Sequence, residues 1–152
     1  MIKVNVEINK KSWQKKIKNP KKYFNLKLKK ITKAIKFLKK KKLTFTILLT
    51  NSAYLKKLNK KFRNKNKATD SLSFPFFSKK NLYLKKEKEI YLGDIAISYE
   101  IINLRSKKSN FNLEFDKVWM HAFLHLLGHD HVKNRDYLKM YKLEKYFLNS
   151  FI

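Results

Sequence analysis

The chain of 152 residues has no cysteine, only two glycines and two prolines, and only 11 acidic residues against 38 lysines and arginines. Without cysteine there is no disulfide and no thiolate ligand, so any zinc site must use histidine or carboxylate side chains. The chain also lacks the run of roughly 18 apolar residues that crosses a membrane. Because its first residues alternate apolar and polar and lack the apolar block of a signal peptide, we expect a cytoplasmic protein that does not bind membranes.

The shortage of acidic residues leaves a formal net charge of +27. So basic a surface attracts polyanions, and nucleic acid is the usual partner. A second interpretation stays open, because a chain rich in lysine and poor in glycine and proline is also typical of an AT-biased coding sequence, where much of the lysine is solvated filler. The only arginines are Arg63, Arg105 and Arg135, and arginine makes a forked phosphate contact that lysine cannot.

The spacing of apolar residues predicts a mixture of strands and helices. Strands are expected at residues 2–8, 43–49, 71–74 and 90–98. Helices are expected from Pro20 to Leu38, from Asn51 or Ser52 to Phe62, at 99–106, from Asn112 to Leu127, and over the stretch carrying Met140, Leu143, Phe147 and Phe151. Residues 78–89 are polar and basic, so a loop or hairpin is expected there. The length and this mixed order predict one domain spanning residues 1–152 with α/β or α+β layering.

All four histidines lie between His121 and His131. On a helix, His121 and His125 lie on one face, one turn apart, and two imidazoles so placed can chelate one ion. Gly128 can adopt a left-handed conformation that ends the helix, and the chain can then bring His131 to the same ion. Three neutral imidazoles leave a coordination position open, as in a catalytic metal site.

Other interpretations of this segment remain. His129 or Asp130 could be a fourth ligand and make the site structural, or the histidines could simply be hydrogen-bonded core residues. The spacing matches the metzincin zinc signature H-E-x-x-H-x-x-G-x-x-H, except that Ala122 replaces the glutamate. That glutamate is the general base of the peptidases, so its absence argues against peptide hydrolysis.

Three motifs resemble those of the YbeY family of ribosomal-RNA maturation endoribonucleases. Residues 121–131 read H-A-F-L-H-L-L-G-H-D-H, similar to the family pattern H-G-x-L-H-L-x-G-Y-D-H. Residues 58–63 (L-N-K-K-F-R) and 69–75 (T-D-S-L-S-F-P) are similar to N-x-x-[YF]-R and T-D-V-L-S-F-P, and residues 92–95 read L-G-D-I, as in the family. Order and spacing agree over roughly residues 45–148. The departures are Ala122 for the usual glycine and His129 for the usual tyrosine; the latter is either a surface residue or an extra ligand or proton carrier.

The resemblance implies a single compact α+β domain, with a small mixed sheet packed against helices and the metal site on a central helix and the turn after it. It implies one zinc ion held by His121, His125 and His131, although copper or nickel also suits imidazole ligands. It further implies cleavage of single-stranded RNA, with a role in 16S rRNA 3′-end maturation and ribosome quality control. The expected partners are therefore rRNA and the small ribosomal subunit, and not DNA.

The same resemblance nominates site residues beyond the ligands. Arg63 matches an arginine near the metal cleft, where a guanidinium can bind a phosphate and stabilise developing charge. The catalytic candidates are Arg63, His121 and Asp130, with Asp130 expected to orient a ligand imidazole. The candidates for substrate binding are Arg63, Asp70 and Ser73, although Asp70 is as well suited to fixing a turn.

Two other functions remain open at this point. One is a metal-dependent hydrolase of another substrate, and the other is a non-catalytic RNA- or ribosome-binding protein with a structural zinc. The general base is also open, because metal-activated water, Asp130, His129 and the RNA 2′-hydroxyl group all suit that role.

Overall fold

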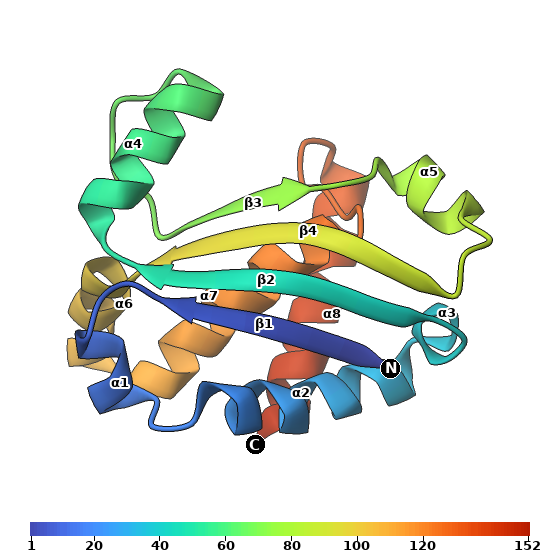
Figure 1. Cartoon of the computed structure of the whole chain (residues 1–152), viewed down its shortest axis with the longest axis horizontal. Coiled ribbons are helices and arrows are strands. Elements are labelled where there is room, and N and C mark those ends of the chain that lie inside the picture. The colour runs from blue at the N-terminus through green and yellow to red at the C-terminus, as the bar shows by residue number, and fades with distance from the viewer.

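The predicted strands form a four-stranded mixed sheet in the computed structural model, which describes residues 1–152 except the side chains of residues 36 and 37 (Figure 1). The sheet order is β1-β2-β4-β3. Strands β1 and β2 and strands β2 and β4 pair in parallel, and β3 pairs antiparallel with β4. The strands are β1 (Ile2–Ile8), β2 (Lys42–Thr50), β3 (Ser71–Pro75) and β4 (Glu89–Ser98).

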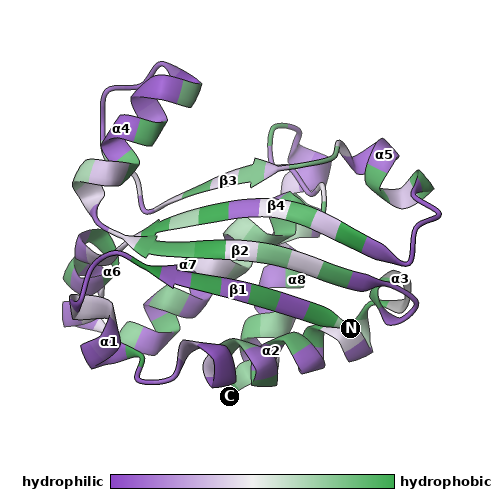
Figure 2. Cartoon of the chain, viewed as in Figure 1, coloured by the Kyte–Doolittle hydropathy of each residue, from purple (hydrophilic) through white to green (hydrophobic). Residues whose placement is uncertain are grey.

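Helices cover one face of this sheet and form the main core with it. In Figure 1, α7 (Phe111–Leu126) and α8 (Asn134–Phe151) lie behind the strands and α2 (Pro20–Ala34) runs below them. Figure 2 shows hydrophobic and hydrophilic residues alternating along β1. The apolar set of β2 is fully buried at Leu43, Phe45, Ile47 and Leu49, and each such side chain contributes about 1.5–3 kcal/mol. The predicted α+β class and the mixed sheet are confirmed.

The opposite face of the sheet carries a smaller apolar cluster under α4 (Ser52–Arg63). Leu55 of this helix is buried against Leu72 of β3 and Ala96 of β4. Asn51, one of the two predicted caps, begins the helix, because its side-chain oxygen accepts a hydrogen bond from the Tyr54 N–H at 2.8 Å. The helix therefore stands at one end of the sheet, beside β3.

Two expectations about local structure were wrong. The helix predicted from Pro20 to Leu38 is interrupted at Ile35, which has an extended backbone (φ −104°, ψ 109°) before the short helix α3 (Lys36–Lys39). This break lets the chain turn toward β2 while Leu38 is still buried. The segment predicted as a loop or hairpin contains α5 (Lys79–Leu84), which begins at a Ser78 cap and buries a single apolar side chain, Leu82.

The remaining helices are short connections at the edges of the sheet. Helix α1 (Ser12–Lys16) was not predicted, and it is anchored by the buried Trp13. Helix α6 (Tyr99–Arg105), continued by the 3-10 turn η1 (Ser106–Lys108), matches the helix expected at 99–106. No helix among the described residues is long and apolar enough to cross a membrane.

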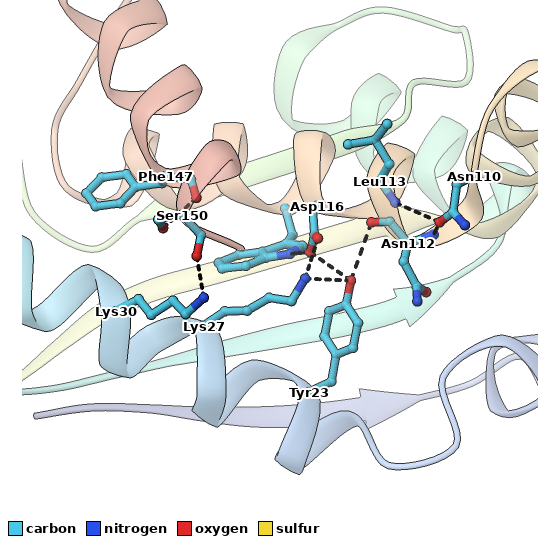
Figure 3. Close-up of polar contacts among 10 residues, drawn as sticks. Tyr23, Lys27, Lys30, Asn110, Asn112, Leu113, Asp116, Phe147 and Ser150 are labelled. Atoms are coloured by element: carbon cyan, nitrogen blue, oxygen red, sulfur yellow. Dashed lines mark hydrogen bonds and ion pairs between the residues drawn. The ribbon is translucent and has the colours of Figure 1, made fainter. Parts of the chain in front are cut away.

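A buried polar network joins α2 to α7 (Figure 3). The Asp116 carboxylate, only 6% exposed, accepts hydrogen bonds from the Tyr23 hydroxyl at 2.7 Å and the Trp119 indole N–H at 2.8 Å, and it forms an ion pair with Lys27. Burial, reinforced by the charge of Asp116, raises the pKa of Tyr23 above its ordinary value, so the hydroxyl stays protonated and donates.

The same network reaches α8. The Phe151 ring stacks on Trp119 with ring centroids 5.7 Å apart, and the Lys27 ammonium lies 4.8 Å from the centre of the Phe151 ring. One carboxylate on α7 is therefore connected to both helices that pack beside it.

We expect Asp116→Ala to lower the free energy of unfolding by roughly 3–5 kcal/mol, because it leaves the Lys27 ammonium and two other donors buried without their acceptor. Urea unfolding followed by circular dichroism measures this loss. The control is Glu89→Ala, which removes the acid of the exposed ion pair with Lys42 and should leave the unfolding midpoint close to that of the wild type. Equal effects of the two substitutions would contradict a structural role for the network.

Candidate metal centre

Three imidazoles meet where α7 ends. One ligand nitrogen from each of His121, His125 and His131 lies within 4.8 Å of the other two. The Nε2 atoms of His121 and His125 are 3.1 Å apart, close to the separation of about 3.4 Å that two nitrogens have on a tetrahedral zinc ion. The predicted ligand set is therefore brought together, and the donors fit a divalent metal ion.

Hydrogen bonds to the other ring nitrogens set the direction of two of these rings. His121 Nδ1 lies 2.6 Å from Glu144 Oε1 on α8, and His125 Nδ1 lies 2.9 Å from the backbone oxygen of His129. A ring that donates its Nδ1–H in this way keeps Nε2 unprotonated for a metal ion. Glu144 thus orients the His121 ring. The sequence analysis missed this residue, although its place on the last helix could have indicated a buried partner. It is four residues after Met140 and three before Phe147, on a buried face where a carboxylate needs a partner.

Gly128 makes the sharp turn between the second and third ligands. Its φ of +82° lies in the left-handed region, and the His129 N–H closes the end of the helix on the Leu124 carbonyl at 3.0 Å. A Cβ at this position would stand 2.6 Å from the Cβ and 2.8 Å from the Cα of Lys79. Glycine is therefore required twice, by the backbone conformation and by the close approach of α5.

Asp130 lies on the turn that carries the third ligand. Its carboxylate accepts a hydrogen bond from the His131 backbone N–H at 2.7 Å, so it holds the main chain of a ligand residue. Its expected contact with a ligand imidazole stays a prediction. The hydrogen bond that orients the His121 ring comes from Glu144 instead.

The three histidines line an open cleft of about 700 Å³. The nominated residues Arg63, Asp70, Ser73 and Asp130 all line it as well, although they come from three different parts of the chain. Phe76 and Lys79 lie in the wall beside them. The arrangement places three imidazoles, an arginine and a lysine around one solvent-filled space.

Arg63 is positioned by the way α4 ends. It is the last residue of the helix and is exposed, and Asn64 after it has a left-handed backbone (φ 54°). The buried Asn59 holds the following turn, because its side-chain N–H donates to the Lys67 carbonyl at 2.9 Å. Arg63 is thereby held beside the cleft with its side chain facing solvent, which suits a group that binds substrate.

Asp70 and Ser73 line the cleft but already have partners in the protein. The Asp70 carboxylate pairs with the Arg105 guanidinium at 2.6 Å and accepts from the Ser71 N–H at 2.7 Å. The Ser73 hydroxyl donates to the Ala122 carbonyl at 3.0 Å and so ties β3 to α7. Both remain predicted substrate contacts, and both clearly stabilise the wall of the cleft.

Burial favours the neutral form of two imidazoles by lowering their pKa. It lowers the pKa of His125, and the nearby His121 lowers it further, which favours the form that binds metal. Burial also lowers the pKa of His129, helped by the positive charges of Lys79 and Lys139. His129 lies outside the three-histidine cluster but lines the same cleft, half-buried.

Comparison with known proteins agrees with these motifs. Residues 7–152 match the family model described as Endoribonuclease YbeY. A relative of that name from Pelagibacter ubique is 51% identical over 146 residues, which is 95% of this chain and 92% of the relative. The chain belongs to the YbeY family. The predicted family resemblance is therefore confirmed, as is the prediction that the protein is an enzyme of the hydrolase class.

More distant proteins agree on the family and the fold. An Endoribonuclease YbeY from Caldicellulosiruptor bescii is 38% identical over 121 residues, covering 75% of this chain and 77% of the relative. The solution structure of TM1509 from Thermotoga maritima superposes with a TM-score of 0.60 at 23% identity. The match covers 97% of this chain and 87% of that one, so the YbeY chain shares its fold along almost its whole length.

We expect Glu144→Ala to weaken metal binding by about 10- to 100-fold, because the His121 ring loses the acceptor that fixes its direction. Glu144→Gln keeps an oxygen acceptor and should lose less. Competition titration against a chromophoric chelator measures both affinities, and Lys145→Ala, on the next residue, is the control. Wild-type affinity in Glu144→Ala would exclude a positioning role.

Gly128→Ala should lower the free energy of unfolding by about 1–3 kcal/mol, because it forces a side chain into a left-handed backbone, and it should weaken metal binding as His131 moves. Thermal unfolding and the same titration report the two effects. Asn64→Gly is the matched control, since glycine accepts the positive φ there and should not destabilise the protein. A Gly128→Ala variant as stable as wild type would contradict the steric argument.

Proposed function

We propose that this YbeY protein is a zinc-dependent endoribonuclease that cleaves single-stranded RNA in the cleft beside α7. The observation that carries the proposal is the convergence of three imidazoles in a cleft that Arg63 also lines. His121, His125 and His131 would hold the ion. Zinc, when bound, supplies a Lewis acid for the phosphate and lowers the pKa of water to roughly 7.

The protein's own side chains would bind the phosphate, hold the RNA backbone and accept a proton. The Arg63 guanidinium binds two oxygens of the phosphodiester and stabilises the charge that develops there. Lys79 and the wider basic surface hold the RNA backbone, so binding should weaken steeply with salt. Two proton acceptors of the chain line the cleft, the Asp130 carboxylate and the neutral His129 imidazole, and the RNA itself offers a 2′-hydroxyl group.

We further propose that the substrate is rRNA, and that the protein acts in the cytoplasm on the small ribosomal subunit. Its tasks there would be maturation of the 16S rRNA 3′ end and ribosome quality control. Family membership and the net charge of +27 support this part of the proposal. DNA is not an expected substrate.

Peptide hydrolysis is disfavoured by the surroundings of Ala122. This residue is fully buried, and its carbonyl oxygen is 3.0 Å from the Ser73 hydroxyl where α7 packs on β3. The glutamate that a metal peptidase carries at this position would have no solvent-filled space to occupy.

The decisive experiment is cleavage of a single-stranded RNA by protein whose metal content has been measured. We expect about one zinc per chain and cleavage by the wild type, which a chelator abolishes and zinc restores. His125→Ala should not cut, and Arg63→Ala should cut about 10²–10³-fold more slowly, with Arg63→Lys in between because lysine cannot make the forked contact. Arg135→Ala, at an exposed arginine outside the cleft, is the control.

Each failure has a distinct meaning. Cleavage by His125→Ala at the wild-type rate would show that the activity is metal-independent or contaminating. Joint loss of fold and RNA binding in the histidine variants would favour a binding protein with a structural zinc. The product ends identify the nucleophile, because attack by the 2′-hydroxyl leaves a cyclic phosphate and attack by water does not.

A further inference from the structure

One aromatic side chain in the cleft is exposed without an obvious structural reason. Phe76 follows the last residue of β3, is 67% exposed, and lines the same cleft as the three histidines. Among the described side chains it is the most exposed phenylalanine. A phenyl ring left in water costs free energy that burial would recover, so its position in the substrate cleft points to a ligand.

The ring is held in place on a rigid support. The Phe76 N–H donates to the Leu92 carbonyl of β4 at 2.8 Å, and its ring meets Phe77 edge-on with centroids 4.9 Å apart. Phe77 packs against the main core. The backbone approaches so closely because residue 93 is glycine: a Cβ there would stand 2.1 Å from the Phe74 carbonyl oxygen and 3.0 Å from the Phe76 nitrogen.

The charges around the ring identify its partner. Arg63 and Lys79 line the cleft with Phe76 and attract phosphate groups. An aromatic face beside cationic side chains is the combination with which proteins bind single-stranded nucleic acid, because the bases stack on the ring while the backbone meets the charges. An apolar peptide would not match a cleft with these charged walls.

We propose that Phe76 is a stacking platform for an unpaired nucleobase of the RNA, and that this stacking makes the cleft select single strands over duplexes. The inference rests on the proposed function and adds the subsite that recognises the substrate. In a duplex each base is covered on both faces by its neighbours, so its ring cannot stack on a protein side chain without being unpaired first. The basic residues alone would bind both forms of RNA.

The first test compares Phe76→Leu, which keeps apolar bulk without an aromatic face, with Phe76→Tyr, which keeps the ring. Binding is measured by fluorescence anisotropy with a labelled 2′-O-methyl oligoribonucleotide at fixed salt, after a gel has shown that it stays intact. We expect Phe76→Leu to bind the single strand about tenfold more weakly, Phe76→Tyr to bind like wild type, and all three to bind duplex RNA equally. Equal single-strand affinity for wild type and Phe76→Leu would overturn the proposal, as would an equal loss on duplex RNA.

A second arm removes the base instead of the ring. Oligonucleotides with one abasic position, moved along the strand, should weaken wild-type binding at the position that faces Phe76. The same change should not weaken Phe76→Leu further, because ring and base form one contact. Additive losses at every position would contradict direct stacking.

A third arm needs no loss of affinity. The two native tryptophans, Trp13 and Trp119, are fully buried, so Phe76→Trp introduces the only solvent-exposed indole. Its emission should be quenched when the oligonucleotide binds. The matched control, Leu26→Trp, places an indole at a 58% exposed site on α2, below the sheet in Figure 1, and should not respond. An unquenched Phe76→Trp in an RNA-bound protein would refute the platform.

These results separate the platform from the activity. If wild type cleaves single-stranded RNA and His125→Ala does not, but Phe76→Leu binds normally, only the platform is refuted. If wild type neither binds nor cleaves RNA, the proposed function fails first. Thermal unfolding of each variant confirms that the exposed site tolerates the substitution.

Discussion

Burial of α7 is the constraint on which the rest of the structure depends. The helix is covered by the sheet on one side and by its neighbouring helices on the other, and nine of its residues are buried. This packing fixes the position of the C-terminal end of α7, where the histidines lie. Because His121 and His125 belong to its last turns, the position of the imidazole nitrogens proposed to bind metal follows from the packing of the whole core rather than from the site itself.

Two contacts from α8 hold α7 and orient one of its histidines. Near one end, Phe151 stacks on Trp119 beside the network of Asp116 and Lys27. In the middle, Glu144 meets the His121 ring. The helix that closes the core thus also orients the ring of His121, one of the three proposed metal ligands.

The parts of the site that the sequence predicts are the local ones. The spacing of His121, His125 and Gly128 encodes the geometry of a helix and its end, so the ligand set could be inferred without a fold. Arg63 could be nominated only through a family resemblance, because its place beside the cleft depends on how α4 meets β3. Glu144 was missed because its partner lies on another helix.

The secondary structure that could be predicted was likewise set by local spacing, and the part that could not was set by contacts between distant residues. All four strands and the main helices were predicted, because alternating or helical spacing marks them directly. The break at Ile35 and the helix α5 were not predicted. Leu38 after the break and Leu82 of α5 are both buried in the main core, and no local spacing marks those contacts. The local sequence likewise does not indicate that Lys79 of α5 packs close to Gly128.

The three histidines lie close together in the sequence, and this affects how much metal binding can stabilise the folded state. The strands pair over long distances in the chain, with Ile2 beside Leu43 and Lys42 beside Glu89, whereas His121, His125 and His131 lie within one short segment. An unfolded chain therefore keeps its three imidazoles near one another, and if they bind metal as proposed it would retain some of that affinity. A ligand stabilises the native state only by its preference for that state. A bound ion would therefore protect this fold less than its affinity alone implies. Its preference for the folded chain would come from contacts that exist only after folding, above all the hydrogen bond between the Glu144 carboxylate and His121.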